Sequence, residues 1–192
     1  DTAQRGFSIR EDAPLDMRMN RNGGQSAATI IATADEAKLA SILYEYGELR
    51  NSRALAAQLV RQREHAPIDT TFALIKALER FAPKFKDHKF YAQVFQAIRI
   101  EVNQELEVLK SLLIQATEIL APKGRLVVIS YHSLEDRLVK RFMKNGLFEG
   151  EPEREFFGNF SVPFRIIEKL IVPTEAEIKL NNRARSAKLR IA

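Results

Sequence analysis

Apolar residues recur with the 3.6-residue period of an α-helix over most of the first 120 positions of the chain. Asp35 is a suitable N-cap for the first clear helix, in which Leu39 and Leu43 share one face. The apolar stripes predict three short helices in succession, over residues 36–46, 53–66 and 70–82. The second and third of these end at prolines, which cannot continue a helix. We therefore expect residues 25–83 to form a small all-helical unit.

The helical period continues over residues 91–124, as one long helix or as two in tandem. The pattern then changes, because RLVVISY at 125–131 is a short apolar run of the kind that is buried on both faces of a parallel sheet. Ser133 follows as an expected N-cap, with Asp136 three residues later, and opens a helix that Gly146 ends. A helix, a strand and a helix in this order indicate an α/β fold.

Two further strands are predicted near the end of the chain, over residues 164–173 and 186–192, after a loop at 146–163. We expect them to form an antiparallel hairpin at the edge of a Rossmann-like sheet. Such a sheet needs more strands than these, so we expect the missing ones upstream of Asp1. The fold class is then α/β, with the last strands of a Rossmann-like sheet and an inserted all-helical domain. The expected parts are a connecting loop (1–22), the inserted helical domain (23–93) and the C-terminal part of the sheet domain (94–192).

Composition excludes several classes of site. The 192 residues include no cysteine, which excludes disulfides, thiolate metal sites and a cysteine nucleophile. The three histidines are scattered, so we expect no metal. No apolar run approaches the roughly 18 residues of a membrane span, and we expect a cytoplasmic protein without a membrane partner. The net charge of +5 favours a polyanionic partner such as RNA, although ordinary surface charge explains it equally well.

The eight glycines form no G-x-G pattern and no phosphate loop, so the chain carries no nucleotide-cofactor fingerprint. A polar cluster without helical period stands near the start, in RGFSIREDAPLDMRMN at residues 5–20. Arg5, Phe7, Asp16 and Arg18 could present an aromatic ring and cations to a flexible base. The alternative is a surface connector that Arg-Asp pairs tie down.

A second cluster follows the predicted strand at 125–131, where His132 and Ser133 enter the next helix directly. Ligands of open parallel sheets bind outside the carboxyl ends of the strands, so a site is expected at this turn. The alternative is a capped turn in which His132 bonds only to backbone.

A third cluster, NNRARSAKLR at residues 181–190, is basic. Strand alternation would put Lys188 and Arg190 on the same face. A row of cations on one face suits phosphates, but a solvated strand face would carry the same residues.

Taken together, the segments RGFS, PLDMRM, FQAIRIEVNQEL, GRLVVISYHSLEDRLVKRFM and NNRARSAKLRIA closely resemble the bacterial 16S ribosomal RNA (cytosine-N4)-methyltransferase family. The match runs in order over nearly the whole chain. The resemblance implies a Rossmann-like domain that binds S-adenosylmethionine and a helical domain inserted late in the sheet. It implies as substrate a cytidine in 16S ribosomal RNA of the small ribosomal subunit, and no DNA.

The resemblance also implies that the glycine-rich donor loop and the LDLGVSS turn lie upstream of Asp1. The catalytic group that accepts the hydrogen bonds of the target amine is then outside this chain, as are the residues that grip S-adenosylmethionine. We expect the isolated fragment to be inactive. The residues implied on the RNA side are Arg5, Phe7, Asp16 and Arg18 at the target base, His132 and Ser133 at the rim of the crevice, and Asn181, Arg183 and Arg185 at the RNA backbone or bracing the RGFS loop.

A hypothesis of a different class stays open beside the enzyme. The chain could serve as a non-catalytic RNA-binding or ribosome-assembly module. A catalytic protein must bind the methyl donor, whereas a binding module need not, so donor binding separates the two hypotheses.

Overall fold

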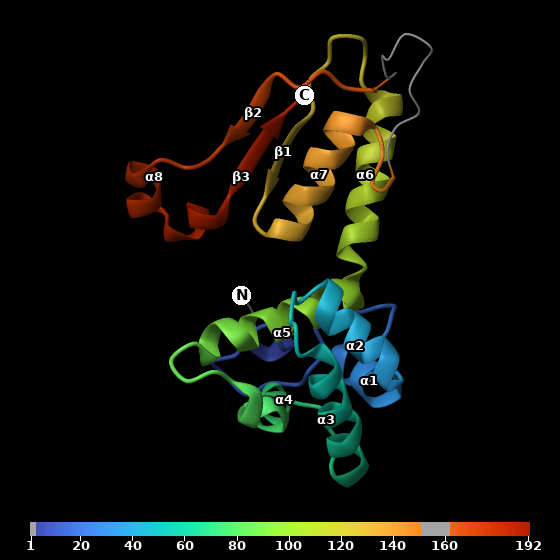
Figure 1. Cartoon of the computed structure of the whole chain (residues 1–192), viewed down its shortest axis with the longest axis vertical. Helices are drawn as coiled ribbons and strands as arrows, with labels where there is room; N and C mark the ends of the chain where they lie inside the picture. The colour runs from blue at the N-terminus through green and yellow to red at the C-terminus, as the bar shows by residue number, and fades with distance from the viewer. Residues whose placement is uncertain (1–2, 151–161) are drawn as a thin grey trace. The chain divides into compact units, whose positions relative to one another are not determined.

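The structure is a computed structural model that describes residues 3–150 and 162–192 (Figure 1). Of the loop predicted at 146–163, residues 151–161 lie outside this description. The fold is α/β, as expected, and the chain divides into two compact units, residues 1–105 and 106–192. The domain boundaries predicted near residues 22 and 93 stay predictions. No helix in the described ranges is long and apolar enough to cross a membrane.

The first unit is helical. Its elements are η1 (Ala3–Arg5), α1 (Ala27–Thr33), α2 (Glu36–Glu45), α3 (Ser52–His65), α4 (Thr71–Leu78), η2 (Glu79–Phe81) and α5 (Asp87–Asn103). The predicted N-cap of α2 is confirmed, because Asp35 Oδ1 accepts a hydrogen bond from the backbone N–H of Lys38 at 2.7 Å. All three short helices are therefore present where the apolar stripes predicted them.

One core holds the first unit together. Leu55, Leu78 and Val94, from α3, α4 and α5, have no measurable exposed surface. Leu15 and Met17, from the N-terminal segment, belong to the same core with 1% exposure each. Burial of such side chains contributes roughly 1.5–3 kcal/mol apiece, so the N-terminal segment is part of the fold of this unit.

The long helical stretch is two helices in tandem. α5 ends at Gln104, which adopts a left-handed conformation (φ 50°, ψ 40°), and α6 (Glu105–Ile119) begins at the next residue. A single left-handed residue ends a helix because its carbonyl and amide no longer follow the helical direction. The apolar period cannot reveal this break, since it continues on both sides.

The second unit contains α6 and a small antiparallel sheet. Its remaining elements are β1 (Val127–Ser130), α7 (Ser133–Asn145), β2 (Glu168–Ile171), α8 (Glu175–Leu180), η3 (Asn182–Ser186) and β3 (Lys188–Ile191). The strand order is β1-β3-β2, and β3 pairs antiparallel with both neighbours. Its core consists of Leu113, Val139, Phe142, Met143 and Ala192.

The predicted antiparallel pairing of the last two strands is confirmed, because β2 pairs antiparallel with β3 and stands at one edge of the described sheet. The connection between them is longer than a hairpin turn, since it contains α8 and η3. The first strand was expected to be buried on both faces, but Val127 is 54% exposed and Ile129 is 53% exposed. The reason is that Val128 packs against the core of this unit, whereas Val127 and Ile129 point to the opposite face of the strand.

Candidate functional site

The N-terminal segment is tied to the helices of the first unit by its backbone. The N–H of Leu15 donates to the carbonyl of Asp69 at 2.8 Å, and Leu15 accepts from the N–H of Ala28 at 2.8 Å. Pro14 forms an isolated antiparallel bridge with Thr70. Thr71, fully buried, donates to the carbonyl of Glu11 at 2.7 Å. The segment is therefore neither a free connector nor a mobile loop, and its side chains are held at fixed places.

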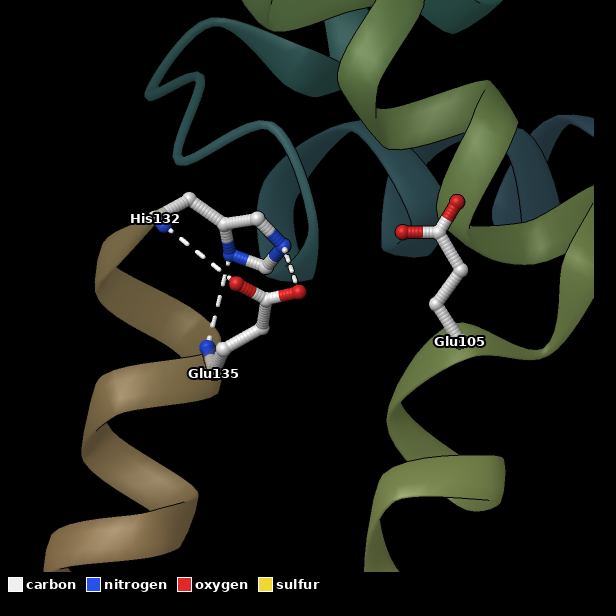
Figure 2. Close-up of side chains that lie close together, drawn as sticks. All are labelled: Glu105, His132 and Glu135. Atoms are coloured by element: carbon white, nitrogen blue, oxygen red, sulfur yellow. Dashed lines mark hydrogen bonds and ion pairs between the residues drawn. The ribbon is translucent and has the colours of Figure 1, made fainter. Parts of the chain in front are cut away.

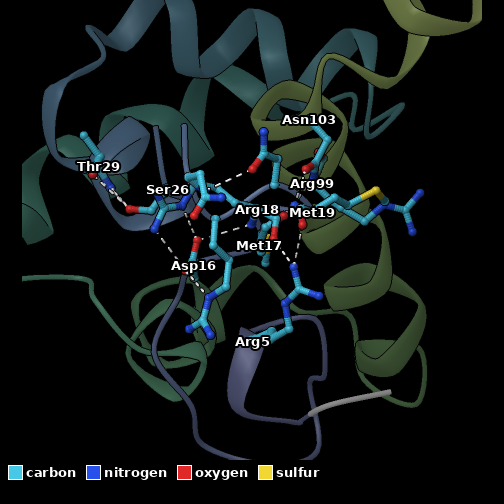
Figure 3. Close-up of polar contacts among 12 residues, drawn as sticks. Arg5, Asp16, Met17, Arg18, Met19, Ser26, Thr29, Arg99 and Asn103 are labelled. Carbon is cyan, nitrogen blue, oxygen red and sulfur yellow. Dashed lines mark hydrogen bonds and ion pairs between the residues drawn. The ribbon is translucent and has the colours of Figure 1, made fainter. Parts of the chain in front are cut away.

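A tight turn at Gly6 sets the start of this segment. Gly6 has φ +76°, and a Cβ at this position would lie 2.6 Å from the carbonyl oxygen of Pro14. Only glycine fits such an approach at a positive φ. Just beside the turn, the guanidinium of Arg5 donates to the carbonyls of Arg18 and Met19 (Figure 3). Arg5 therefore closes the segment into a loop.

Asp16 and Arg18 neutralise each other within this loop (Figure 3). Asp16 accepts from the Nε of Arg18 at 2.6 Å and from its Nη2 at 3.2 Å, and Arg21 lies 3.8 Å away. The hydrogen bond from Arg18 lowers the pKa of Asp16 below its ordinary value, against the opposing effect of burial. The alternative of a segment tied down by Arg-Asp pairs thus describes these two side chains.

Phe7 lines an open cavity of about 350 Å³ at the surface of the first unit. The guanidinium of Arg5 stands over its ring at 5.5 Å, a cation–π contact. The cavity is lined by Phe7, Ser8, Ile9, Arg10, Met17, His88, Ala92, Phe95, Gln96 and Arg99. The loop supplies one wall and α5 the other.

The residues that α5 contributes to this cavity were missed by the sequence analysis. Gln96 donates its amide to the carbonyl of Tyr46 at 3.1 Å, and Arg99 holds Glu105 through two bonds of 2.8 and 2.9 Å. His88 is exposed, and it also lines the cavity. The available signal was their spacing, which places His88, Gln96 and Arg99 on one face of α5 at helical period.

In the second unit, His132 is the N-cap of α7 (Figure 2). Its Nδ1 accepts from the N–H of Glu135 at 3.4 Å, and Glu135 accepts from the N–H groups of Tyr131 and His132 at 3.0 and 3.4 Å. The predicted N-cap, Ser133, is instead the first helical residue. Burial alone would raise the pKa of Glu135, but its bonds to His132 and Tyr131 outweigh that and lower it.

The basic C-terminal cluster separates into two groups. Asn181 accepts from the N–H of Arg183 at 3.1 Å and opens η3, where Asn181, Arg183 and Arg185 are all exposed. Lys188 and Arg190 do share a face of β3, as alternation predicted, but both reach Asp136 of α7, at 3.3 Å and 2.7 Å. The η3 residues are exposed at the surface, whereas Lys188 and Arg190 both bind an acid within the protein.

The predicted site residues are thus brought together in groups. Arg5, Phe7, Asp16 and Arg18 lie in one loop of the first unit, and the others lie in the second. Within either unit alone, no three histidine or carboxylate side chains of the described residues lie close enough to one another to hold a metal ion.

Comparison with known proteins gives one consistent family. The MraW methylase family matches residues 1–192. The chain is 57% identical over 192 residues to the ribosomal RNA small subunit methyltransferase H of Flavobacterium johnsoniae, and 58% identical to that of Flavobacterium psychrophilum. The protein of the same name from Bacteroides thetaiotaomicron is 54% identical over 193 residues. All three matches cover the whole chain but only 64%, 66% and 64% of these relatives, which is just under two thirds.

Proposed function

Since the chain belongs to the MraW methylase family, we propose that its protein transfers a methyl group from S-adenosylmethionine to the N4 amine of a cytidine in 16S ribosomal RNA. Three relatives carry the name ribosomal RNA small subunit methyltransferase H, which supports a ribosomal RNA substrate and the small subunit as partner. The proposed fold of the whole protein is a Rossmann-like sheet with the helical unit inserted. The exposed apolar face of β1 supports it, because Val127 and Ile129 would be covered in a larger sheet domain.

The observation that carries the proposal is the cavity beside Phe7. It has an aromatic edge at Phe7, apolar walls at Ile9 and Phe95, and polar groups at Gln96 and Arg99. A single-stranded base is recognised by stacking on an aromatic ring and by hydrogen bonds to its edges. The target cytidine must leave its stack to be methylated, and this cavity would receive it.

Arg5, Asp16 and Arg18 act mainly as positioning residues in this proposal. All three form hydrogen bonds within the loop itself. Arg5 donates to the carbonyls of Arg18 and Met19, and Arg18 donates to Asp16. Their role is to hold the ring of Phe7 at the cavity. Preorganisation of this kind matters because a small misplacement of the reacting groups costs a large factor in rate.

In the second unit, we assign contacts with the RNA to two places. The exposed guanidiniums of Arg183 and Arg185 would bind phosphates, and Asn181 fixes the turn that carries them. His132 and Ser133 lie at the carboxyl end of β1, where ligands of α/β sheets bind. His132 Nε2 lies 3.3 Å from Glu135 Oε1, so its ring is held in place and would shape the rim of the crevice.

S-adenosylmethionine would supply the electrophilic methyl group. The described glycines do not fit it, since those with close neighbours approach other parts of the protein. Gly6, Gly47 and Gly124 approach the backbone of Pro14, Leu43 and Ala121, and Gly146 approaches the side chain of Pro163. We therefore assign no residue that grips the donor to the described part of this chain.

The test is methylation of small ribosomal subunits by the protein at its natural length. Phe7→Leu should lower turnover about tenfold or more, because stacking on an aromatic ring contributes roughly 1–3 kcal/mol. Arg183→Ala and Arg185→Ala should each lower it about tenfold, in keeping with a charge-assisted hydrogen bond of roughly 1.5–3 kcal/mol. The matched control is Lys179→Ala, which removes an exposed cation from α8.

Each possible outcome has a defined meaning. Unchanged turnover in both arginine variants would mean that η3 is a solvated turn that does not contact the RNA. Binding of ribosomal RNA without binding of S-adenosylmethionine would favour a non-catalytic RNA-binding or assembly module instead.

A further inference from the structure

Phe85, in the turn between η2 and α5, is an unusual residue in this structure. It is 99% exposed, more than any other large apolar side chain of the described residues. Its backbone also lies in the left-handed region, with φ +64°. For a bulky residue this conformation is a genuine outlier, and it costs free energy relative to glycine. The protein therefore holds an aromatic ring in water at a backbone position that disfavours it.

The turn itself is well defined. The N–H of Lys86 donates to the carbonyl of Pro83 at 3.1 Å, and Lys86 in turn accepts from the N–H of Phe90 at 3.1 Å. Phe90 is buried in the core of the first unit. The ring of Phe85 is thus presented from a turn that is fixed at its base, but it packs on nothing in the described structure. A purely structural role would leave such a ring at least partly covered.

Cations surround this ring along the chain. Lys84, Lys86 and Lys89 are exposed, and none of them has an ion-pair partner among the described residues. Asp87 is the one acid in the segment 83–89. An exposed aromatic ring flanked by unpaired lysines matches a single-stranded nucleic acid, in which each base offers a face to stack on and each linkage offers a phosphate.

We propose that Phe85 is a stacking platform for a base of single-stranded RNA, and that Lys84, Lys86 and Lys89 contact the phosphates on either side of that base. The inference rests on the proposed function in taking RNA as the substrate. His88 lies in the same segment and lines the cavity of Phe7. The platform would therefore hold a nucleotide near the target base and help to set which stretch of RNA enters the cavity.

The experiment measures binding of a fluorescently labelled single-stranded oligocytidylate to the protein by anisotropy. Phe85→Gly should weaken binding by about 5- to 150-fold, the factor that corresponds to loss of one stacked base. Phe85→Trp should keep or improve the affinity. The control is Tyr44→Ala, which removes an exposed ring of the same unit that has Glu45 rather than lysines beside it.

A second readout separates a binding role from a structural one. Glycine accepts the left-handed conformation without strain, so Phe85→Gly should leave the urea midpoint of the protein unchanged or raise it. Weaker RNA binding with unchanged or higher stability is the expected combination. Reduced stability together with weaker binding would mean that Phe85 serves the fold, and it would overturn the proposal.

The lysines are tested through the salt dependence of binding. Replacing Lys84, Lys86 and Lys89 by glutamine should reduce the slope of log affinity against log salt by about 2, because each phosphate contact on a single strand contributes roughly 0.7. Lys76→Gln, on α4, is the matched control and should leave the slope unchanged.

The outcomes distinguish this inference from the proposed function. Wild-type affinity in Phe85→Gly would refute the platform while leaving the methyltransferase proposal intact. Absence of RNA binding by the wild-type protein would refute both the platform and the methyltransferase proposal. If the protein binds anionic phospholipid vesicles through Phe85, and Phe85 contributes nothing to RNA binding, then the partner of this ring is a membrane surface and the proposal is refuted.

Discussion

Asp136→Ala should lower the free energy of unfolding of the second unit by about 3 kcal/mol. Asp136 is 8% exposed, and its carboxylate accepts from Arg190 at 2.7 and 3.2 Å and from Lys188 at 3.3 Å. The side chain of Arg190 is itself 11% exposed. Removing the carboxylate therefore leaves a guanidinium that keeps the carbonyl of Lys169 but has lost its charged partner and has not regained water.

The magnitude follows from which charge is left behind. Breaking a buried ion pair by removing one partner costs roughly 3–5 kcal/mol, and the remaining exposure of this pair places it at the lower end. The double variant Asp136→Leu with Arg190→Met leaves no buried charge and should cost about 1 kcal/mol or less. Lys188 does not change this estimate, because its side chain is 36% exposed and can be hydrated. The double variant should thus be about 2 kcal/mol more stable than Asp136→Ala, the sign that the two positions are coupled.

Urea unfolding followed by far-UV circular dichroism measures the effect. With a slope of about 2 kcal/mol/M, the midpoint of the Asp136→Ala variant should fall by about 1.5 M. Hydrogen exchange at the β1–β3 amides localises the loss to the second unit. Lys140→Ala, an exposed position of the same helix, is the control and should stay within about 0.5 kcal/mol. An Asp136→Ala variant as stable as this control, or a double variant no more stable than Asp136→Ala, would refute the reasoning.

The same pair gives a pH dependence. Burial raises the pKa of Asp136, but the hydrogen bond and charge of Arg190, with those of Lys188, outweigh burial and lower it. A carboxylate whose pKa is lower in the folded than in the unfolded state stabilises the fold above its unfolded value, roughly 3.9. This stability is lost as the pH falls through the folded pKa. Asp136→Asn should therefore flatten the acid side of the stability profile below about pH 4.

The remaining predictions concern the N-terminal loop. Gly6→Ala should destabilise the first unit by about 2 kcal/mol or more, measured by urea unfolding, because a Cβ would lie 2.6 Å from the Pro14 carbonyl oxygen and φ is +76°; a loss below 0.5 kcal/mol would contradict the tight turn. Thr71→Val should cost about 1–3 kcal/mol, since the hydroxyl donates to Glu11 and accepts from Ala13 at 3.1 Å in a fully buried position. Faster hydrogen exchange at Ala13 is the expected local sign, and unchanged exchange there would count against the role of Thr71.

The helices were predictable because their information is local. The stripe of Leu39 and Leu43 and the cap at Asp35 lie within one turn or two of each other, and the structure confirms α2. The break at Gln104 was not predictable in this way. A single residue in a left-handed conformation leaves the apolar period on both sides intact, so the sequence offered one helix and two helices as equal possibilities.

The candidate site was predictable in part. The loop of Arg5 and Phe7 was selected because it lacks amphipathic period and concentrates polar groups. Its partners on α5, His88, Gln96 and Arg99, were missed, because they are distant in sequence and come together only when the loop packs on that helix. The functional assignment of all these residues stays a prediction until the variants are measured.

The C-terminal strand shows most directly what the sequence determined and what tertiary structure decided. Alternation along KLRI put Lys188 and Arg190 on one face, since side chains of a strand point to opposite faces in turn. Whether that face meets phosphate, water or protein depends on what packs there, and the answer is Asp136, more than 50 residues earlier in the chain. Local patterns determine helices, strands and faces because their periods are fixed by backbone geometry. The partners of charged groups are decided by which distant segments the fold brings within a few ångströms.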